Sequence, residues 1–350
     1  MRSFESVIVA EEAHIGQAKR VVRRCASEAG FGERQLAEIE IAINEIATNS
    51  VKFGRGTGRI FFAPADESLD NAGLEIIYMD KGPGIEDLNG ALEDGFTTAG
   101  SLGAGLGAIK RMADEFHIYS TPERQTFRLP LYGRTTHGTV IVFKKWLNAK
   151  PREQSSRREL WAAMTRASQD GEANGDAYII RRDGDRRLVA VIDGLGHGFG
   201  AKEAASETLA VIEKRATEPL ENILRVAHES LKQTRGAVAG LAAIDLAKGV
   251  IEFAGIGNTD CRVLGGRDAV RFISLNGTLG SRMERVKVFR EQLPKVATVV
   301  MTTDGVSERW DAANYPGLLG QHPSLLCAAI LRDFSRPNDD ATIVCGRLQT

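Results

Sequence analysis

Four places in the second half of the chain pair an aspartate with a glycine or with a second aspartate. They are Gly175-Asp176, Asp193-Gly194, Asp304-Gly305 and Asp339-Asp340. Two of these pairs end the apolar runs RLVAVIDG and ATVVMTTDG, which have the length and composition of buried strands. Each pair alone is an ordinary turn, but a carboxylate at the end of a buried strand is costly without a counter-ion. Together the pairs predict an acidic site at one sheet edge.

An acidic site of this kind is suited to divalent cations. Mg²⁺ and Mn²⁺ prefer oxygen ligands, and two such ions about 4 Å apart can activate water and clamp a phosphoryl group. The sequence therefore indicates metal-assisted hydrolysis of a phosphate ester. His197, close after Asp193, could protonate the leaving oxygen; a turn histidine without chemistry is an equal alternative.

The first half of the chain carries a second group of candidate residues. Glu45 and Asn49 lie four apart on a predicted helix, so both leave one face, where they can take a proton and bind Mg²⁺. Asp80 ends an apolar strand and precedes Gly82 and Gly84, which let a ligand approach the backbone. Solvated helix residues and a surface turn are the plain alternatives.

A glycine-rich segment follows these residues. Its glycines are Gly100, Gly103, Gly105 and Gly107. They open a predicted helix over 106–116, and the backbone N–H groups at such a helix start favour phosphate. A dinucleotide-binding motif is excluded because no strand precedes the glycines, and a P-loop is excluded because no Gly-Lys-Ser/Thr follows them.

A competing signal comes from Cys261 and Arg267, which have the C-x5-R spacing of cysteine-dependent phosphatases. That chemistry needs a strand before the loop and a helix after it. Here apolar runs flank a Gly-Gly-Arg-Asp turn, which predicts a β-hairpin. The four cysteines show no C-x-x-C spacing, which argues against disulfides or a zinc site and favours a reducing compartment.

Composition limits the class of protein. The 350 residues, 43% hydrophobic and 26% charged, are enough for about two domains. The net charge of −1 argues against nucleic acid or anionic membrane as the main partner. The sequence shows neither a secretory signal at its start nor an apolar run long enough to cross a membrane, so we expect a cytoplasmic protein.

The elements that must position these residues follow from periodicity. Apolar residues at spacings of three and four predict a helix over 33–51; strands are predicted over 74–79 and in GTVIVFKKW, which ends at Trp146. A polar segment over 149–158 predicts a linker between domains of residues 1–148 and 159–350. Short β runs with one clear helix, 202–214, follow it, so the fold class is α+β.

The N-terminal motifs, in this order, resemble the GHKL ATPase fold. EDGFTTAGSLGAGLGAIKRMADEF followed by GTVIVFKKWL is similar to the RsbT-type anti-sigma regulatory Ser/Thr kinases. The resemblance implies an α/β sandwich with a mixed sheet and helices on one face, and ATP with Mg²⁺ as its ligand. It also implies a STAS-domain antagonist, or a stressosome-like protein, as the phosphorylated partner.

The same resemblance assigns roles to residues. Glu45 is implied as the catalytic residue that orients or deprotonates the acceptor hydroxyl, Asn49 as the Mg²⁺ ligand, and Asp80 as the residue that reads adenine. The implied ATP-binding residues are Glu45, Asn49, Asp80, Gly82, Gly84, Gly100, Gly103, Gly105, Leu106, Gly107 and Thr139.

The second half has its own resemblance. IDGLGHGFGAKEAA, with TTDGVSE and RPNDDATIV downstream, resembles the SpoIIE/RsbX branch of metal-dependent Ser/Thr protein phosphatases over about residues 158–348. The resemblance implies a β-sandwich flanked by helices, and two Mn²⁺ or Mg²⁺ ions, with Asp193 and Asp304 in catalytic positions. The implied metal ligands are Asp176, Asp193, the Gly194 carbonyl, Asp304 and Asp339, with Asp340 behind them; which of the last two binds directly stays open.

We therefore expect a bifunctional switch protein that phosphorylates and dephosphorylates Ser/Thr of a STAS-domain partner in sigma-factor or stress signalling. Two alternatives stay open. In one, the N-terminal domain only binds nucleotide and partner and regulates the phosphatase. In the other, the whole chain is a non-catalytic anti-sigma scaffold.

Overall fold

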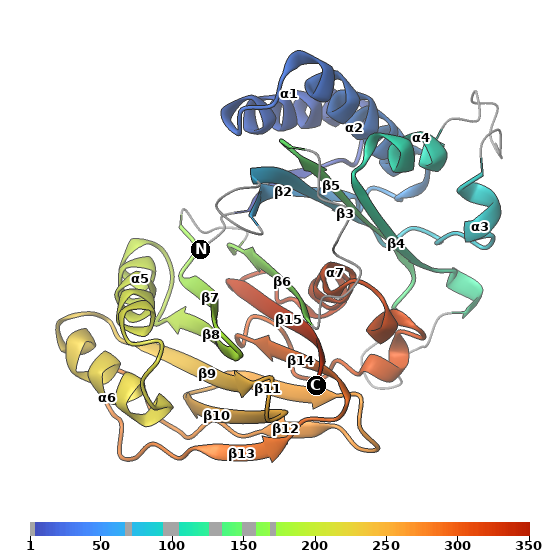
Figure 1. Cartoon of the computed structure of the whole chain (residues 1–350). Coiled ribbons are helices and arrows are strands. Elements are labelled where there is room, and N and C mark those ends of the chain that lie inside the picture. The colour runs from blue at the N-terminus through green and yellow to red at the C-terminus, as the bar shows by residue number, and fades with distance from the viewer. Residues whose placement is uncertain (1–3, 67–71, 94–104, 126–134, 149–158, 169–172) are drawn as a thin grey trace. The chain divides into compact units, whose positions relative to one another are not determined.

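The computed structural model describes residues 4–66, 72–93, 105–125, 135–148, 159–168 and 173–350 (Figure 1). Contacts divide the chain into two compact units, one mainly of residues 2–155 with 312–318 and one mainly of 156–311 with 319–350. The linker predicted over 149–158 lies outside the described residues, so the predicted domain boundaries stay a prediction. Among the described residues, no helix is long and apolar enough to cross a membrane.

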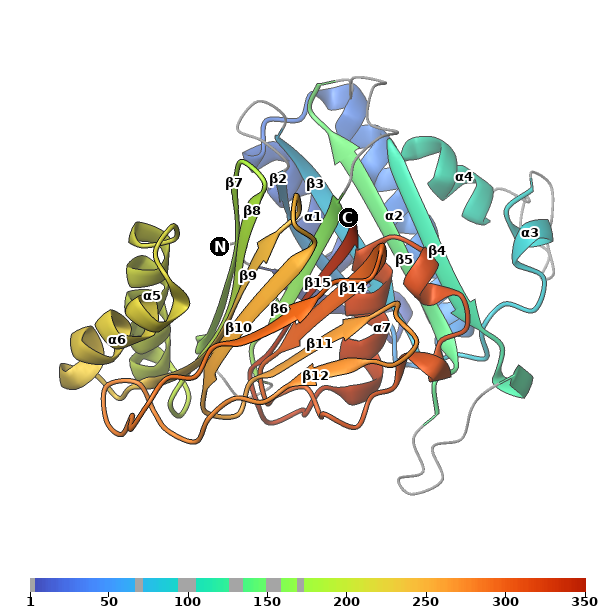
Figure 2. The ribbon, with the colours of Figure 1, turned by 60° about the horizontal axis from the view of Figure 1, so that its bottom comes forward.

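The N-terminal unit places three helices on one face of a five-stranded sheet of order β1-β2-β3-β5-β4 (Figures 1 and 2). Its elements are β1 (Glu5–Ile8), α1 (Glu12–Glu28), α2 (Glu33–Phe53), β2 (Arg59–Asp66), β3 (Ala72–Met79), α3 (Leu88–Ala91), α4 (Gly105–Met112), β4 (Glu115–Thr121) and β5 (Gly138–Trp146). The fold class is as predicted. The expectation of a mixed sheet is wrong: all strand pairs among this unit's described residues are antiparallel.

Helix α2 forms where the apolar spacing predicted it and runs two residues further. Leu36, Ile39, Ile43 and Ile46 are all buried against the sheet, so one stripe of the helix faces the core. The opposite stripe leaves polar residues such as Glu45 only half-buried.

The helix predicted over 106–116 is wrong at its end. Helix α4 stops at Met112, and Phe116 belongs to strand β4. The reason is Asp114, whose Oδ2 accepts the Trp146 N–H at 2.7 Å and whose own N–H bonds to the Lys144 carbonyl at 3.0 Å. These bonds tie the chain to β5 and turn it into a strand, although the apolar spacing continues.

The C-terminal unit is built from two five-stranded antiparallel sheets, of order β13-β10-β9-β8-β7 and β12-β11-β14-β15-β6. Its elements are β6 (Glu159–Arg166), β7 (Asp176–Asp183), β8 (Arg186–Gly194), α5 (Phe199–Lys214), α6 (Leu220–Ser230), β9 (Ala237–Asp245), β10 (Val250–Ile256), β11 (Asp260–Leu264), β12 (Val270–Phe272), β13 (Phe289–Gln292), β14 (Val296–Thr302), α7 (Pro323–Phe334) and β15 (Ala341–Gln349).

Strand β8 shows how the sandwich is held together. Leu188, Ala190 and Ile192 face the core under α5 and α6, whereas Val189 and Val191 face the core between the sheets. Alternate residues of one strand therefore fill two cores, as the pleat of a strand dictates. Helix α7 covers the outer face of the other sheet against β6 and β15 (Figure 2). The predicted β-sandwich flanked by helices is confirmed.

The sequence analysis missed helices α1 and α3 of the N-terminal unit and two helices of the C-terminal unit. Helix α6 carries a readable stripe, with Leu220, Ile223, Leu224 and Ala227 buried. Helix α7 gives no such signal, because nearly all of its side chains are buried and its sequence, PSLLCAAILRDF, has no polar face until its end. Helix α5 begins three residues before the predicted Lys202.

Candidate functional sites

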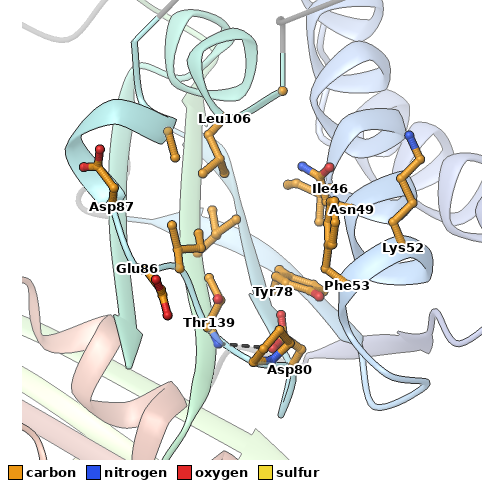
Figure 3. A pocket seen from close by; sticks show the side chains of 16 residues that line it. Ile46, Asn49, Lys52, Phe53, Tyr78, Asp80, Glu86, Asp87, Leu106 and Thr139 are labelled. Carbon is orange, nitrogen blue, oxygen red and sulfur yellow. Dashed lines mark hydrogen bonds between the residues drawn. The ribbon is translucent and has the colours of Figure 1, made fainter. Parts of the chain in front are cut away.

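A cavity of about 490 Å³ opens in the N-terminal unit between helices α2 and α4 and strands β3 and β5 (Figure 3). Six residues predicted from the sequence line it: Asn49, Asp80, Gly84, Gly105, Leu106 and Thr139. They come from four separate segments, so the fold brings together residues that are far apart in the sequence. The cavity can hold a small ligand of nucleotide size.

Asp80 lies at the base of this cavity, just after β3. Asp80 is only 6% exposed, so its carboxylate needs partners within the protein. Its Oδ1 accepts the N–H of Gly82 at 2.7 Å and the N–H of Thr139 at 3.2 Å, and these two hydrogen bonds fix the carboxylate (Figure 3). A Cβ on Gly82 would lie 2.4 Å from the Phe53 carbonyl oxygen. On Gly84, where φ is +72°, it would lie 2.3 Å from the Thr121 oxygen. The fixed carboxylate can accept from a ligand amine.

Only some of the remaining predicted residues of this site line the cavity. Asn49 lines the cavity, and a Cβ on Gly105, the first residue of α4, would lie 3.8 Å from its Nδ2. Glu45 lies one helical turn before Asn49, half-buried, but does not line the cavity. Gly107 is buried within α4. Gly100 and Gly103 lie outside the described residues.

The sequence analysis missed Lys52, Phe53 and Tyr78, which also line the cavity (Figure 3). The first two were detectable, since they follow Asn49 by three and four positions and so share its helix face. Burial, the neighbouring Asp80 charge and a hydrogen bond with Asp80 raise the pKa of Tyr78, outweighing an opposing hydrogen bond with Ser50. The tyrosine therefore stays neutral beside the carboxylate.

In the C-terminal unit, Asp176 and Asp193 face each other directly across the β7–β8 pair. Asp176 is 2% exposed, and its Oδ2 accepts from the Thr303 hydroxyl at 2.6 Å. Thr303 in turn accepts the Thr342 N–H at 2.9 Å. Residues next to β14 and within β15 therefore orient a carboxylate that β7 carries.

The electrostatics of this pair fit a cation site. Burial, and then the repulsion of neighbouring aspartates, raise the pKa of Asp176 to about 8 and that of Asp193 to about 9. Burial and the charge of Asp304 also raise the pKa of Asp339. Together with Asp304, these three carboxyl groups make a donor set suited to hard divalent cations, whose charge would reverse these shifts.

The two neighbouring acids before β15 divide into different roles. Asp340 is 6% exposed and accepts two backbone N–H groups, from Ser168 at 2.7 Å and from Gly175 at 2.6 Å. Asp339 is half-buried and interacts with Asp304. Asp340 therefore fixes the backbone at Ser168 and Gly175, whereas Asp339 is the one that faces the other acids; its role as the direct metal ligand stays a prediction.

One expectation about geometry is wrong. The acids do not gather at the edge of one sheet, since Asp176 and Asp193 belong to one sheet of the sandwich, whereas Asp304 and Asp339 adjoin strands of the other. The carboxylates interact because two sheets packed face to face bring their strand ends together.

Two residues of this site were missed. Arg166, at the end of β6, donates to the carbonyls of Arg336 at 2.7 Å, Asp339 at 3.3 Å and Pro337 at 3.4 Å, and so holds the turn that carries Asp339. Asn258 donates its Nδ2 to Asp304 Oδ2 at 2.5 Å. Neither contact has a local sequence signal, because the partners are far apart in the chain.

The turn after Asp193 is packed against an arginine. Arg235 donates to the His197 carbonyl at 3.3 Å, and a Cβ on Gly200 would lie 2.6 Å from its Nε. Glycine at 200 therefore makes room for the guanidinium. The His197 side chain is exposed, and its proposed acid role stays a prediction.

The thiol alternative fails on geometry, as the sequence analysis expected. Cys261 lies within β11, fully buried, and pairs with Phe272 of the antiparallel strand β12, so the segment is a β-hairpin. Burial raises the pKa of Cys261 well above its usual value, so the reactive thiolate is not formed near neutral pH.

Comparison with known proteins supports a two-part chain. A family model described as a histidine kinase-like ATPase domain matches residues 8–130. The serine/threonine-protein kinase RsbT of Bacillus subtilis is 40% identical over 147 residues, which are 42% of this chain and 99% of RsbT.

The second half matches a different family. The model of stage II sporulation protein E (SpoIIE) matches residues 183–349. The phosphoserine phosphatase RsbX of Bacillus subtilis is 24% identical over 181 residues, which are 50% of this chain and 87% of RsbX. A crystal structure of RsbX with magnesium has a TM-score of 0.51 at 20% identity, covers 56% of this chain and 98% of its own, and shows the fold alone.

The two folds and their sites thus define a kinase-like ATPase domain of the GHKL type fused to a SpoIIE-type phosphatase domain. Through its first half, the chain belongs to the family of the serine/threonine-protein kinase RsbT. Its second half is similar to RsbX and to stage II sporulation protein E.

Proposed function

We propose that this protein is a bifunctional switch that adds a phosphoryl group from ATP to Ser/Thr of a STAS-domain partner and removes it again. The observation that carries the hydrolytic half is the pair of buried Asp176 and half-buried Asp193, opposite each other on neighbouring strands, whose raised pKa values make a divalent cation the natural counter-charge. RsbX, which shares this half's fold, is a phosphoserine phosphatase.

In the phosphatase domain, Asp176, Asp193, the Gly194 carbonyl, Asp304 and Asp339 would hold two Mn²⁺ or Mg²⁺ ions. Such ions, when bound, activate water and neutralise phosphoryl oxygens. The chain's own residues set the geometry: Thr303 orients Asp176, Asn258 orients Asp304, and Arg166 holds the turn of Asp339.

A metal titration tests this half. The full-length protein, freed of metal, is given a phosphoserine peptide with Mn²⁺ or Mg²⁺, and phosphate release is measured. We expect release only with metal, its loss in Asp193→Asn, and no loss after thiol alkylation. Release that survives chelation and stops on alkylation would overturn the metal mechanism and return Cys261 to consideration.

In the kinase domain, Asp80 would accept a hydrogen bond from adenine, Asn49 would bind the Mg²⁺ that accompanies ATP, and the start of α4 would lie near the phosphates. Glu45 would orient or deprotonate the acceptor hydroxyl. RsbT, at 40% identity, is named a serine/threonine-protein kinase, which supports transfer rather than binding alone.

A second candidate has its own support. Glu45 does not line the cavity, as expected if the domain binds nucleotide and partner without transferring phosphate. Labelled ATP with a purified STAS-domain protein separates the two. Label on the partner that is lost in Glu45→Ala establishes the kinase, whereas ATP binding without transfer establishes the regulatory module. If the phosphoserine substrate also stays intact in the presence of Mn²⁺ and no label reaches the partner, the remaining hypothesis is a non-catalytic scaffold.

A further inference from the structure

A second cavity, of about 370 Å³, opens beside Asp304 in the phosphatase unit. Its walls come from the β10–β11 turn, the end of β12, the end of β14 and the turn before β15. Asn258, which donates to Asp304, forms part of the rim. Because the cavity shares Asp304 with the carboxylate cluster, whatever occupies it lies next to the centre where the phosphate ester is to be cleaved.

The two arginines that line this cavity differ in whether a carboxylate pairs with them. Arg271 donates its Nε to Asp260 Oδ1 at 2.7 Å and an Nη2 to Glu308, so its charge is balanced by two carboxylates. Arg336 is exposed. Its charge acts on Asp339, but its side chain forms neither a hydrogen bond nor an ion pair with the described residues. The cavity therefore presents one uncommitted cation.

The backbone of Arg336 is nevertheless fixed. Its N–H donates to the Gly305 carbonyl at 2.7 Å, and its own carbonyl accepts from Arg166 at 2.7 Å. The guanidinium thus extends from an anchored position, which limits the entropy lost when it pairs with an anion.

An apolar side chain completes the lining. Ile273, just after the edge strand β12, lines the cavity although 67% of its surface is exposed. An exposed apolar group beside an uncommitted cation suits a polypeptide segment, which offers both aliphatic stems and charged ends.

We propose that this cavity binds the segment of the protein substrate next to the phosphorylated residue, and that Arg336 selects an acidic side chain in that segment. The proposal rests on the phosphatase activity proposed above. It adds the recognition element, because the carboxylate cluster itself can handle only the phosphoryl group.

The test compares two synthetic peptides, each with one central phosphoserine, flanked on both sides by glutamate or by lysine. With the full chain and Mn²⁺, we expect kcat/KM for the glutamate peptide to exceed that for the lysine peptide about tenfold, as for one well-formed charge pair. In Arg336→Glu the preference should reverse. Arg290→Glu, the same charge change at an exposed β13 residue outside the cavity, should keep the original preference.

A second variant tests the apolar part. Ile273→Asp should raise KM for the glutamate peptide several-fold, whereas Val296→Asp, at an exposed apolar residue of the same sheet that does not line the cavity, should not. Equal ratios in wild type and Arg336→Glu would overturn the proposal. Hydrolysis of p-nitrophenyl phosphate keeps the two failures apart: no hydrolysis by wild type with Mn²⁺ sinks the phosphatase activity, whereas hydrolysis with no peptide preference sinks only the recognition site.

Discussion

At the scale of single residues, the proposed phosphatase site is a group of aspartates whose ionisation the fold disfavours. Asp176 and Asp193 oppose each other across two strands. Burial makes both carboxyl groups harder to ionise, and the charge of Asp176 adds to this effect at Asp193. Such a site is stable either protonated or with bound cations.

The first prediction concerns pH. Since the pKa values of Asp176 and Asp193 are raised in the folded state to about 8 and 9, the metal-free native protein binds more protons than the unfolded chain above about pH 4. Its free energy of unfolding from these groups therefore falls as the pH rises from about 4 to about 9. Thermal unfolding in chelator at several pH values should show this fall, and Asp193→Asn should flatten it. A slope unchanged in the variant would contradict the assignment.

The second prediction concerns Arg166. Arg166→Met keeps the apolar stem but removes the bonds to the carbonyls around Asp339, so the turn loses its anchor. We expect Mn²⁺ affinity, measured by calorimetry, to fall at least about tenfold. Arg181→Met, at an exposed β7 arginine, serves as the control. Equal Mn²⁺ affinities in the two variants would show that the turn carrying Asp339 does not need the hydrogen bonds from Arg166.

At the scale of elements, the segment from β8 to α5 is shaped by what packs over it. Gly200 lies in the first turn of α5, where alanine would ordinarily favour a helix. Here a methyl group would collide with Arg235. Local helix preference and packing therefore oppose each other at this position.

The third prediction uses this conflict. Gly200→Ala should leave the melting temperature unchanged or higher, yet weaken Mn²⁺ affinity because Arg235 no longer holds the turn beside Asp193. Arg235→Ala should have the same effect, and the double variant should be no worse than either single one. Additive losses would show that the two residues act separately. Arg225→Ala, at an exposed arginine of α6, is the matched control.

The elements also show what a sequence can and cannot reveal. Helix α2 and strand β5 were predictable because one apolar stripe or run decides each. The end of α4 was not, since a bond from Asp114 to the distant Trp146 overrides the local spacing. The acids and glycines of both sites can be recognised in the sequence from their residue types and neighbours. Arg166 and Asn258 cannot, because they act through partners 170 and 46 positions away.

At the scale of the whole molecule, the chain carries two sites in two units, each with its own core. No described residue is shared between the cavity that holds Asp80 and the carboxylate cluster around Asp193. A change at one site should therefore leave the chemistry of the other in place.

The fourth prediction follows from this separation. Asp80→Asn removes a charged acceptor at the base of the cavity proposed to bind ATP, so ATP affinity should fall about tenfold to a hundredfold, as for a lost charged hydrogen bond. Manganese-dependent hydrolysis of p-nitrophenyl phosphate by the same variant should persist. Asp193→Asn should show the opposite pattern. Loss of both activities in either variant would show that the units depend on each other.

Strand β8 carries Asp193 as its next-to-last residue, and its alternate side chains pack into two cores. Deleting a single residue between Arg187 and Ile192 would swap every side chain between the helix side and the sandwich interior, and would also turn the acid away from Asp176. One strand register thus sets both the burial of apolar side chains on the two faces of β8 and the direction of the Asp193 carboxylate. Any shift of register would therefore disturb the cores and the acidic site together.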